Sequence, residues 1–173
     1  MTRIALVVLL GVSTLAGCTA GGSGASPTSA GGTTDARVST SESAGLGCRS
    51  DYTPRALPTW ATAGFNPPTQ PMPHVLGDSG DIVAILWAAH DPLVVPPAAN
   101  QNNKILWVPR VSSPVGAPLE IHATLNGTGE TATRTVDGGP GPSIIDLPSP
   151  GCWSIGLTWG DHHDHLELEY VAG

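Results

Sequence analysis

The alternation of apolar and polar residues near the C-terminus decides the fold, where residues 153–170 read WSIGLTWGDHHDHLELEY. Apolar side chains occupy every second position in two runs, namely Trp153, Ile155, Leu157 and Trp159, and then Leu166, Leu168 and Tyr170. Because successive side chains of a strand point to opposite faces, each run predicts a strand with one buried and one solvated face. The polar residues 160–164 between the runs predict the turn of a hairpin.

Segments upstream of this hairpin also have the composition of strands. Residues 81–88 are continuously apolar after Asp81, which predicts a strand covered on both faces. Residues 119–125 alternate like the hairpin, and residues 131–136 are rich in β-branched side chains. Shorter apolar runs lie at residues 104–108 and 143–147. No segment keeps a helical period over about ten residues, so roughly seven short strands predict an all-β fold, a single antiparallel β-sandwich.

Residues 48–80 are rich in proline. Proline lacks a backbone donor and fixes φ, so this segment is predicted to be extended loop draped over the core. Trp60 and Phe65 are its expected apolar anchors, with Trp60 partly exposed. The other tryptophans fall in strand-like runs and are predicted core residues: Trp87, Trp107, Trp153 and Trp159.

Two motifs carry a resemblance. Residues 102–110 (NNKILWVPR) and 148–160 (PSPGCWSIGLTWG) resemble segments of uncharacterised actinobacterial lipoproteins with an immunoglobulin-like β-sandwich domain. The resemblance implies an immunoglobulin-like fold, in which the Pro-Gly-Cys-Trp step leads into a late strand and Trp153 packs near a disulfide at Cys152. It implies a lipid-anchored location and brings no known activity.

The N-terminus has the pattern of an export signal. Residues 1–17 contain Arg3, an apolar run at 4–10 that is too short to span a bilayer, and small residues before Cys18. The tetrad at 15–18 (LAGC) resembles the lipobox of bacterial lipoproteins. The resemblance implies cleavage before Cys18, a diacylglyceryl group on its sulfur and an acyl group on its amine. We therefore expect a lipid anchor on the extracytoplasmic face of the cell membrane; the alternative is a secreted protein with a chance cysteine.

The rest of the chain divides into a linker and one domain. Residues 18–46 are almost entirely Gly, Ser, Thr and Ala after the cysteine. Such a segment cannot bury enough apolar surface to fold, so we expect a flexible tether between the lipid and a domain at residues 47–173. A domain of that size has one core.

The net charge of −7, with 14 acidic and 7 basic residues, argues against a nucleic-acid partner, because a chain with excess negative charge has no basic surface to attract phosphates. The same charge gives no attraction to anionic lipid, so the lipid on Cys18 is expected to supply the membrane attachment. The remaining partners that fit an exported module are an envelope protein or a glycan.

The cysteines that remain after lipidation are Cys48 and Cys152. In an oxidising compartment two such cysteines usually form a disulfide, which here would tie the N-terminal segment to the sandwich. Two thiols or a metal-binding pair are the alternatives.

A cluster of polar residues at 161–165 is a candidate metal site. His162, His163 and His165 offer imidazole ligands for zinc or copper, flanked by two aspartates. In an extended stretch His163 and His165 point to the same face, and Glu167 continues that row. The alternatives are a solvated hairpin turn and a histidine pH sensor. No other cofactor is expected.

Residues 77–81 (GDSGD) resemble the nucleophile segment of trypsin-like serine proteases, and His90 follows a pair of alanines. The order of histidine and serine is reversed relative to that family, and a turn explains the motif equally well. No catalytic constellation stands out, so we expect a binding or accessory module of the cell envelope rather than an enzyme. Metal binding and a structural envelope protein are alternatives, and a hydrolase using Ser79 and His90 is a remote one.

Overall fold

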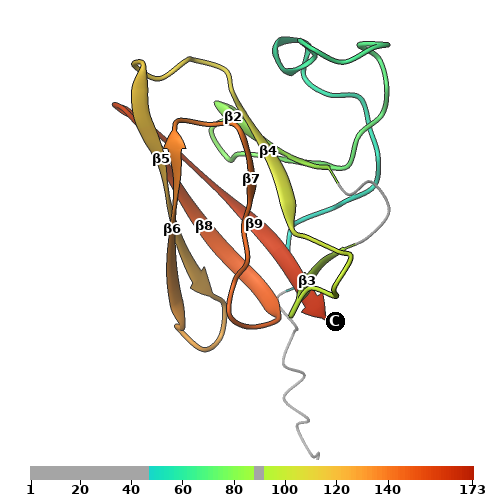
Figure 1. Ribbon diagram of the computed structural model, residues 1–173, viewed down its shortest axis with the longest axis vertical. Helices are drawn as coiled ribbons and strands as arrows, with labels where there is room; N and C mark the ends of the chain where they lie inside the picture. Colours follow the sequence, from blue (N-terminus) through green and yellow to red (C-terminus); the bar gives the residue numbers. More distant parts are fainter. Residues whose placement is uncertain (1–46, 88–91) are drawn as a thin grey trace, which may run out of the picture. The chain divides into compact units, whose positions relative to one another are not determined.

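The computed structural model describes residues 47–87 and 92–173, which form two β-sheets packed face to face (Figure 1). The predicted signal, the lipidation site at Cys18 and the tether fall on residues 1–46, and His90 falls on residues 88–91, so these lie outside the described residues. Within the described part, the helical content is a single 3-10 turn, η1 (Thr59–Ala61).

One sheet has four antiparallel strands in the order β1-β2-β4-β7. Their bounds are β1 (His74–Leu76), β2 (Ile82–Leu86), β4 (Lys104–Pro109) and β7 (Pro142–Ile144). The other sheet has five strands in the order β3-β9-β8-β5-β6. Their bounds are β3 (Leu93–Val95), β5 (Gly116–Leu125), β6 (Thr131–Gly138), β8 (Gly151–Trp159) and β9 (His162–Ala172).

The connections cross between the sheets as in an immunoglobulin-like sandwich. Consecutive strands β2 and β3 belong to different sheets, and so do β4 and β5 and also β7 and β8. The C-terminal hairpin β8–β9 lies in the middle of the five-stranded sheet, next to β5. The predicted all-β sandwich is confirmed, with one difference. Strand β3 runs parallel to β9, which makes this sheet mixed rather than purely antiparallel.

The predicted alternation is confirmed in β5, β8 and β9, whose inward side chains form the core between the sheets. Three tryptophans predicted in the core are fully buried, namely Trp107, Trp153 and Trp159. Each indole N–H donates a hydrogen bond, to Ser143 Oγ, to the Ser149 carbonyl and to the Val111 carbonyl respectively. The prediction for Trp87 is wrong: it follows the end of β2 and is 47% exposed.

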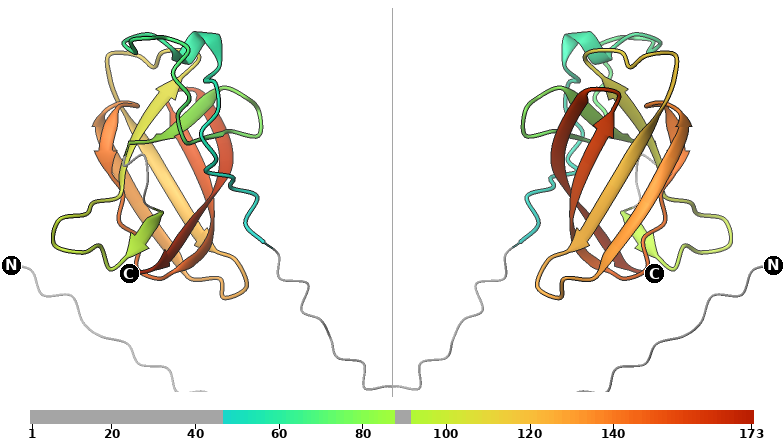
Figure 2. Two further views of the ribbon diagram at one scale, coloured as in Figure 1. Left: turned by 90° about the vertical axis from the view of Figure 1, so that its right-hand side faces the viewer. Right: turned by 90° about the vertical axis from the view of Figure 1, so that its left-hand side faces the viewer.

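A segment that we call the N-terminal strap, residues 48–73, covers the outer face of the four-stranded sheet. In Figure 2 its first part runs beside β9 before it reaches the other sheet. Leu57, Ala61 and Met72 pack there against Val83 and Ile85 of β2. Because the sandwich core covers the opposite face, every residue of β2 is buried, as its unbroken apolar run predicts. The half-buried Trp60 and Phe65 pack against the same cluster, as anchors were expected to do.

The hairpin turn is shorter than predicted. Trp159 pairs with His162, so the loop has two residues, Gly160 and Asp161. Gly160 has a φ of 60°, which the tight connection requires and glycine adopts without steric cost. The histidines assigned to the turn therefore belong to β9.

Candidate functional site

The polar side chains of β8 and β9 line the outer face of the five-stranded sheet, which points away from the other sheet. Outward positions of β9 carry His163, His165, Glu167 and Glu169, between the buried Asp164, Leu166, Leu168 and Tyr170. Those of β8 carry Cys152, Ser154, Gly156 and Thr158. The pairing register sets His165 opposite Gly156 and Glu167 opposite Ser154. This face therefore gathers the ionisable groups that the sequence leaves on one side of the hairpin.

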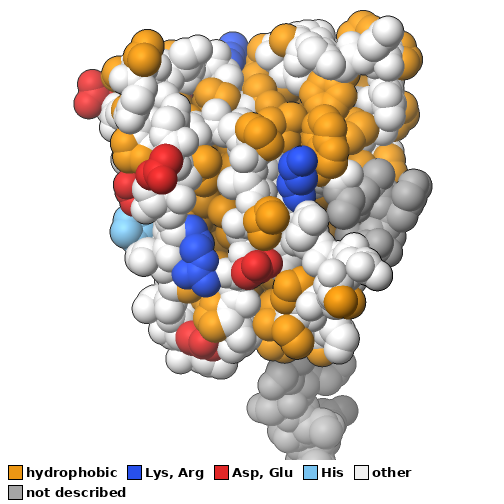
Figure 3. All heavy atoms as spheres, viewed as in Figure 1, with side chains coloured by type: hydrophobic (Ala, Val, Ile, Leu, Met, Phe, Trp, Pro, Cys, Tyr) orange, Lys and Arg blue, Asp and Glu red, His pale blue; other side chains and the backbone are white. Residues whose placement is uncertain are grey.

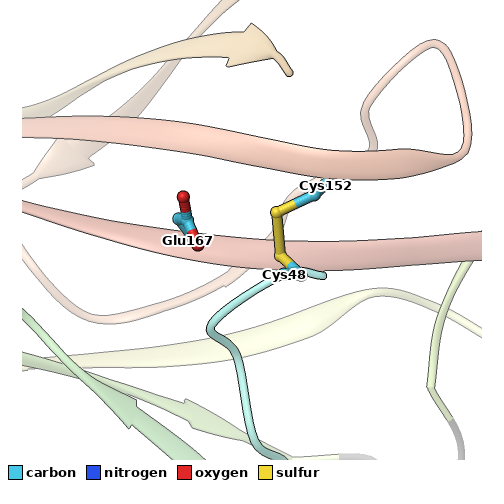
Figure 4. Close-up of side chains that lie close together, drawn as sticks. All are labelled: Cys48, Cys152 and Glu167. Atoms are coloured by element: carbon cyan, nitrogen blue, oxygen red, sulfur yellow. A yellow bond between two sulfur atoms is a disulfide. The ribbon is translucent and has the colours of Figure 1, made fainter. Parts of the chain in front are cut away.

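Cys48 and Cys152 form the predicted disulfide, with an S–S distance of 2.11 Å across 104 residues of chain. Figure 4 shows the bridge between the strap and β8, with Glu167 of β9 beside it. The bridge thus ties the strap to the outer face of the sheet, as expected. The resemblance implied that Trp153 packs near the bridge, but Trp153 points into the core on the opposite face, because neighbouring residues of a strand face opposite ways.

Glu167 and the disulfide form the one group, among the described residues, in which three potential ligand atoms lie within 4.8 Å of one another. A cysteine binds a metal ion through its thiolate, and these two sulfurs are bonded to each other. The group is therefore a structural crosslink with a carboxylate beside it.

Arg49, the residue after the bridge in the strap, connects that carboxylate to the turn at residues 77–81. Its backbone N–H and its Nε donate to Glu167 Oε2, at 2.8 and 3.3 Å. Its Nη2 lies 3.5 Å from Asp78 Oδ2. The backbone hydrogen bond from Arg49 is the largest cause that lowers the pKa of Glu167. Both carboxylates are thus held in the ionised form beside one guanidinium.

The candidate metal ligands are in three different environments. His162 packs against Trp159, with 5.7 Å between ring centroids, and His163 is exposed. His165 has both ring nitrogens engaged by protein partners. Among the described residues the three histidines do not form a group of the kind found at the disulfide. Metal binding stays a prediction, and titration of zinc or copper into the wild type and a His163→Ala/His165→Ala variant tests it.

The turn at residues 77–81 is organised around Asp164, an inward-pointing carboxylate that is 5% exposed. Asp164 Oδ1 accepts hydrogen bonds from the backbone N–H groups of Ser79 and His165, both at 2.8 Å, and Oδ2 accepts one from Asp81 at 3.0 Å. The protease-like motif is therefore a backbone cradle for a carboxylate of the chain's own β9. Ser79 supplies a main-chain donor to it, and the proposed partner His90 lies outside the described residues.

This turn places Asp78 in contact with His165. Asp78 N–H donates to the His165 carbonyl at 2.7 Å, and Asp78 Oδ2 lies 2.9 Å from His165 Nδ1. The other ring nitrogen, Nε2, lies 2.7 Å from Ser154 Oγ of β8. We call Asp78, His165 and Ser154 the relay. Sequence reasoning singled out His165 but missed Ser154 and this role of Asp78, because only the register of β8 against β9 and the packing of the turn bring them together.

A second surface lies at the end of the four-stranded sheet. The Trp87 and Phe65 rings are tilted by 45° to each other, with 6.0 Å between ring centroids, and Lys104 Nζ lies 5.7 Å from the Trp87 ring centroid. Lys104 pairs with Ile144, which is 56% exposed. Two residues along β4, on the same face, Leu106 is half-buried. In Figure 3 hydrophobic side chains gather over β4 and the neighbouring strap. We call Phe65, Trp87, Lys104, Leu106 and Ile144 the Trp87 surface.

No protein-family model, curated protein or solved structure matches this chain. In the part of the chain that the structure describes, none of the helical segments has the length and apolar character to cross a membrane.

Proposed function

We propose that this chain is a lipid-anchored module on the extracytoplasmic face of the cell membrane that binds a protein partner of the envelope through the Trp87 surface. The single observation that carries the binding role is the exposure of Trp87, which is 47% open although the strap covers Val83 and Ile85 on the same face. A large aromatic side chain left open beside aliphatic neighbours is typical of an interaction surface.

The chemistry of this surface favours a protein over a sugar. Leu106 and Ile144 are aliphatic and offer no hydrogen bond through their side chains, whereas a sugar site combines aromatic rings with polar groups that bind hydroxyls. Lys104, the one lysine of the chain, supplies a positive charge next to Trp87. The partner segment would therefore carry apolar side chains and a carboxylate that pairs with Lys104.

The disulfide supports the proposed compartment. Structural disulfides persist outside the reducing cytosol, and this one crosslinks positions 104 residues apart. Mass spectrometry of the N-terminal peptide of the mature protein tests the anchor: it should begin at Cys18 and carry a diacylglyceryl group. A Cys18→Ala variant should leave the membrane fraction, and an unmodified Cys18 would refute the anchor.

Cross-linking in cells that produce the full-length chain tests the binding role. A specific protein captured by the wild type should be lost from the Trp87→Ala and Lys104→Glu variants. Val111→Ala is the matched control, because Val111 is also 47% exposed and lies outside the surface. Exchanging a partner carboxylate for lysine should restore capture by Lys104→Glu. Equal capture by the wild type and by Trp87→Ala, or binding of the chain to purified glycan instead of a protein, would overturn the proposed partner.

A further inference from the structure

The relay is a continuous hydrogen-bonded chain of a carboxylate, an imidazole and a hydroxyl from three separate elements. Asp78 comes from the turn at residues 77–81, His165 from β9 and Ser154 from β8. Both links have heavy-atom distances below 3 Å, at 2.9 and 2.7 Å, within the range in which a base can take the proton of a nucleophile.

The carboxylate sets the direction of both hydrogen bonds. The hydrogen bond with His165 and the charge of Arg49 lower the pKa of Asp78, so its oxygens act as acceptors at neutral pH. Nδ1 of His165 must therefore carry the proton and donate it to Asp78. In the neutral imidazole Nε2 is then the acceptor, and Ser154 Oγ–H donates to it. This is the arrangement that makes a serine oxygen more nucleophilic.

The surrounding structure holds these groups in place. Asp78 is fixed to His165 by its backbone as well as by its side chain, and the turn that carries it is held by Asp164. Ser154 and His165 lie on neighbouring strands of a ladder with nine residue pairs in register. A relay built on rigid elements loses little entropy on reaction.

We propose that Ser154 is a nucleophile that accepts an acyl group from small activated esters, with His165 as its base and Asp78 orienting that base. Ser154 Oγ attacks the ester carbonyl and forms a new C–O bond, while its proton passes to His165 Nε2. The bond to the leaving alcohol breaks, and the leaving oxygen takes the proton from His165. Water then releases the acid by the same steps.

The position of the relay limits the substrates. It lies on an outer face, with 37% of the His165 side chain and 51% of the Asp78 side chain exposed. On this face Gly156 has no side chain to fill the position between His165 and His122 of β5, which leaves a small molecule access to the imidazole. Since β8 lies between β5 and β9, its backbone is committed to their ladders. The developing negative charge would therefore not be met by a backbone N–H of β8, and the Arg49 guanidinium is already paired with Glu167 and Asp78. This favours esters with good leaving groups.

A fluorophosphonate probe tests the proposal on the full-length chain, because it reports the nucleophile whether or not hydrolysis follows. Ser154 Oγ should displace fluoride from phosphorus, giving a phosphonylated Ser154 that mass spectrometry locates. The Ser154→Ala variant should lose the adduct. His165→Gln, which keeps a hydrogen-bonding amide but cannot take the proton, should slow labelling at least tenfold, and so should Asp78→Asn.

The matched control is Ser79→Ala, which removes an exposed hydroxyl outside the relay and should label like the wild type. Equal melting temperatures of the wild type and Ser154→Ala would show that loss of the adduct is not loss of fold. An absent adduct, an adduct on another residue, or a rate unchanged by His165→Gln would overturn the proposal. None of these outcomes depends on the Trp87 surface, so the two proposals are tested separately.

Discussion

Asp164 shows how one buried carboxylate organises residues that are far apart in sequence. Its oxygens satisfy three backbone N–H groups, two of them in a turn more than 80 residues away. A buried charge is tolerated only when such partners compensate for lost hydration. The turn at residues 77–81 thus explains why Asp164, an inward-pointing residue of β9, is polar. Because Asp164 holds this turn against β9, Asp78 of the turn contacts His165.

The residue with the least freedom next to this carboxylate is Gly77. A Cβ at this position would overlap the carboxyl group of Asp164. We expect Gly77→Ala to displace Asp164 from its donors and to lower the free energy of unfolding by about 2–4 kcal/mol, measured by urea denaturation. Gly141→Ala is the control, because a Cβ there meets its nearest atom at 3.8 Å, an ordinary contact. Equal stability of the two variants would contradict this role of Asp164.

At the scale of elements, the short strand β3 depends on the Asn103 side chain, which makes hydrogen bonds to its backbone as a neighbouring strand would. Asn103 is 1% exposed; its Oδ1 accepts from Val94 N–H and its Nδ2 donates to the Val94 carbonyl, both at 2.9 Å. The same Nδ2 donates to Asp146 Oδ1 at 2.8 Å. The amide thereby satisfies the edge of β3 that faces away from β9.

Removing that amide should loosen β3 before the rest of the sandwich. We expect Asn103→Ala to lower the free energy of unfolding by about 2–3 kcal/mol, because it leaves the buried N–H and carbonyl groups of Val94 without hydrogen-bond partners. Hydrogen exchange should show faster exchange at residues 93–95 than in β8. Asn102→Ala is the control, since Asn102 is exposed. Uniform loss of protection across β3 and β8 would contradict a local role for Asn103.

The sequence patterns predicted the elements whose signal is local and missed those that depend on partners. The period of two predicted the inward faces of β5, β8 and β9, and the unbroken run predicted burial of β2. Strands β1 and β3 were not predicted, because each is only three residues long and lies among prolines and loops. Their stability comes from pairing with β2 and β9 respectively. The predicted hairpin turn, residues 160–164, was too long because His162, His163 and Asp164 are polar, although all three belong to β9.

At the scale of the whole molecule, the candidate sites depend on contacts of high sequence separation. Asp78 and His165 are 87 residues apart, and Arg49 and Glu167 are 118 apart. Neither pair leaves a local signal, so the relay was not predictable from motifs. The exposure of Trp87 was not predictable either, because its apolar neighbours in the sequence predict a buried strand. How far along β2 the strap covers the sheet is decided by tertiary packing.

The two tyrosines link the strap to β9 and β9 to the residue after β7, and their ionisation makes the stability of the fold depend on pH. Tyr52 of the strap accepts from Glu169 N–H and donates to its carbonyl, at 2.7 and 3.0 Å. These groups of β9 lie just before the stretch that β3 pairs, so Tyr52 continues the edge that β3 begins. Tyr170 is buried and donates to the carbonyl of Ile145, the residue after β7, at 2.7 Å. Burial raises the pKa of Tyr52 to about 12 and raises that of Tyr170 further.

Because both hydroxyls have a higher pKa in the folded chain than their ordinary value near 10, ionisation favours the unfolded chain. Their contribution to stability is complete below about pH 10 and is lost as pH rises above it, at about 1.4 kcal/mol per pH unit for each tyrosine. We expect the absorbance of tyrosinate at 295 nm to appear together with unfolding in an alkaline titration, not before it. Tyr52→Phe should be less stable at neutral pH, because it cannot accept from Glu169 N–H, and its stability should fall about half as steeply with pH. Ionisation of either tyrosine near pH 10 in a chain that stays folded would contradict the burial of these hydroxyls and, with it, the docking of the strap along β9.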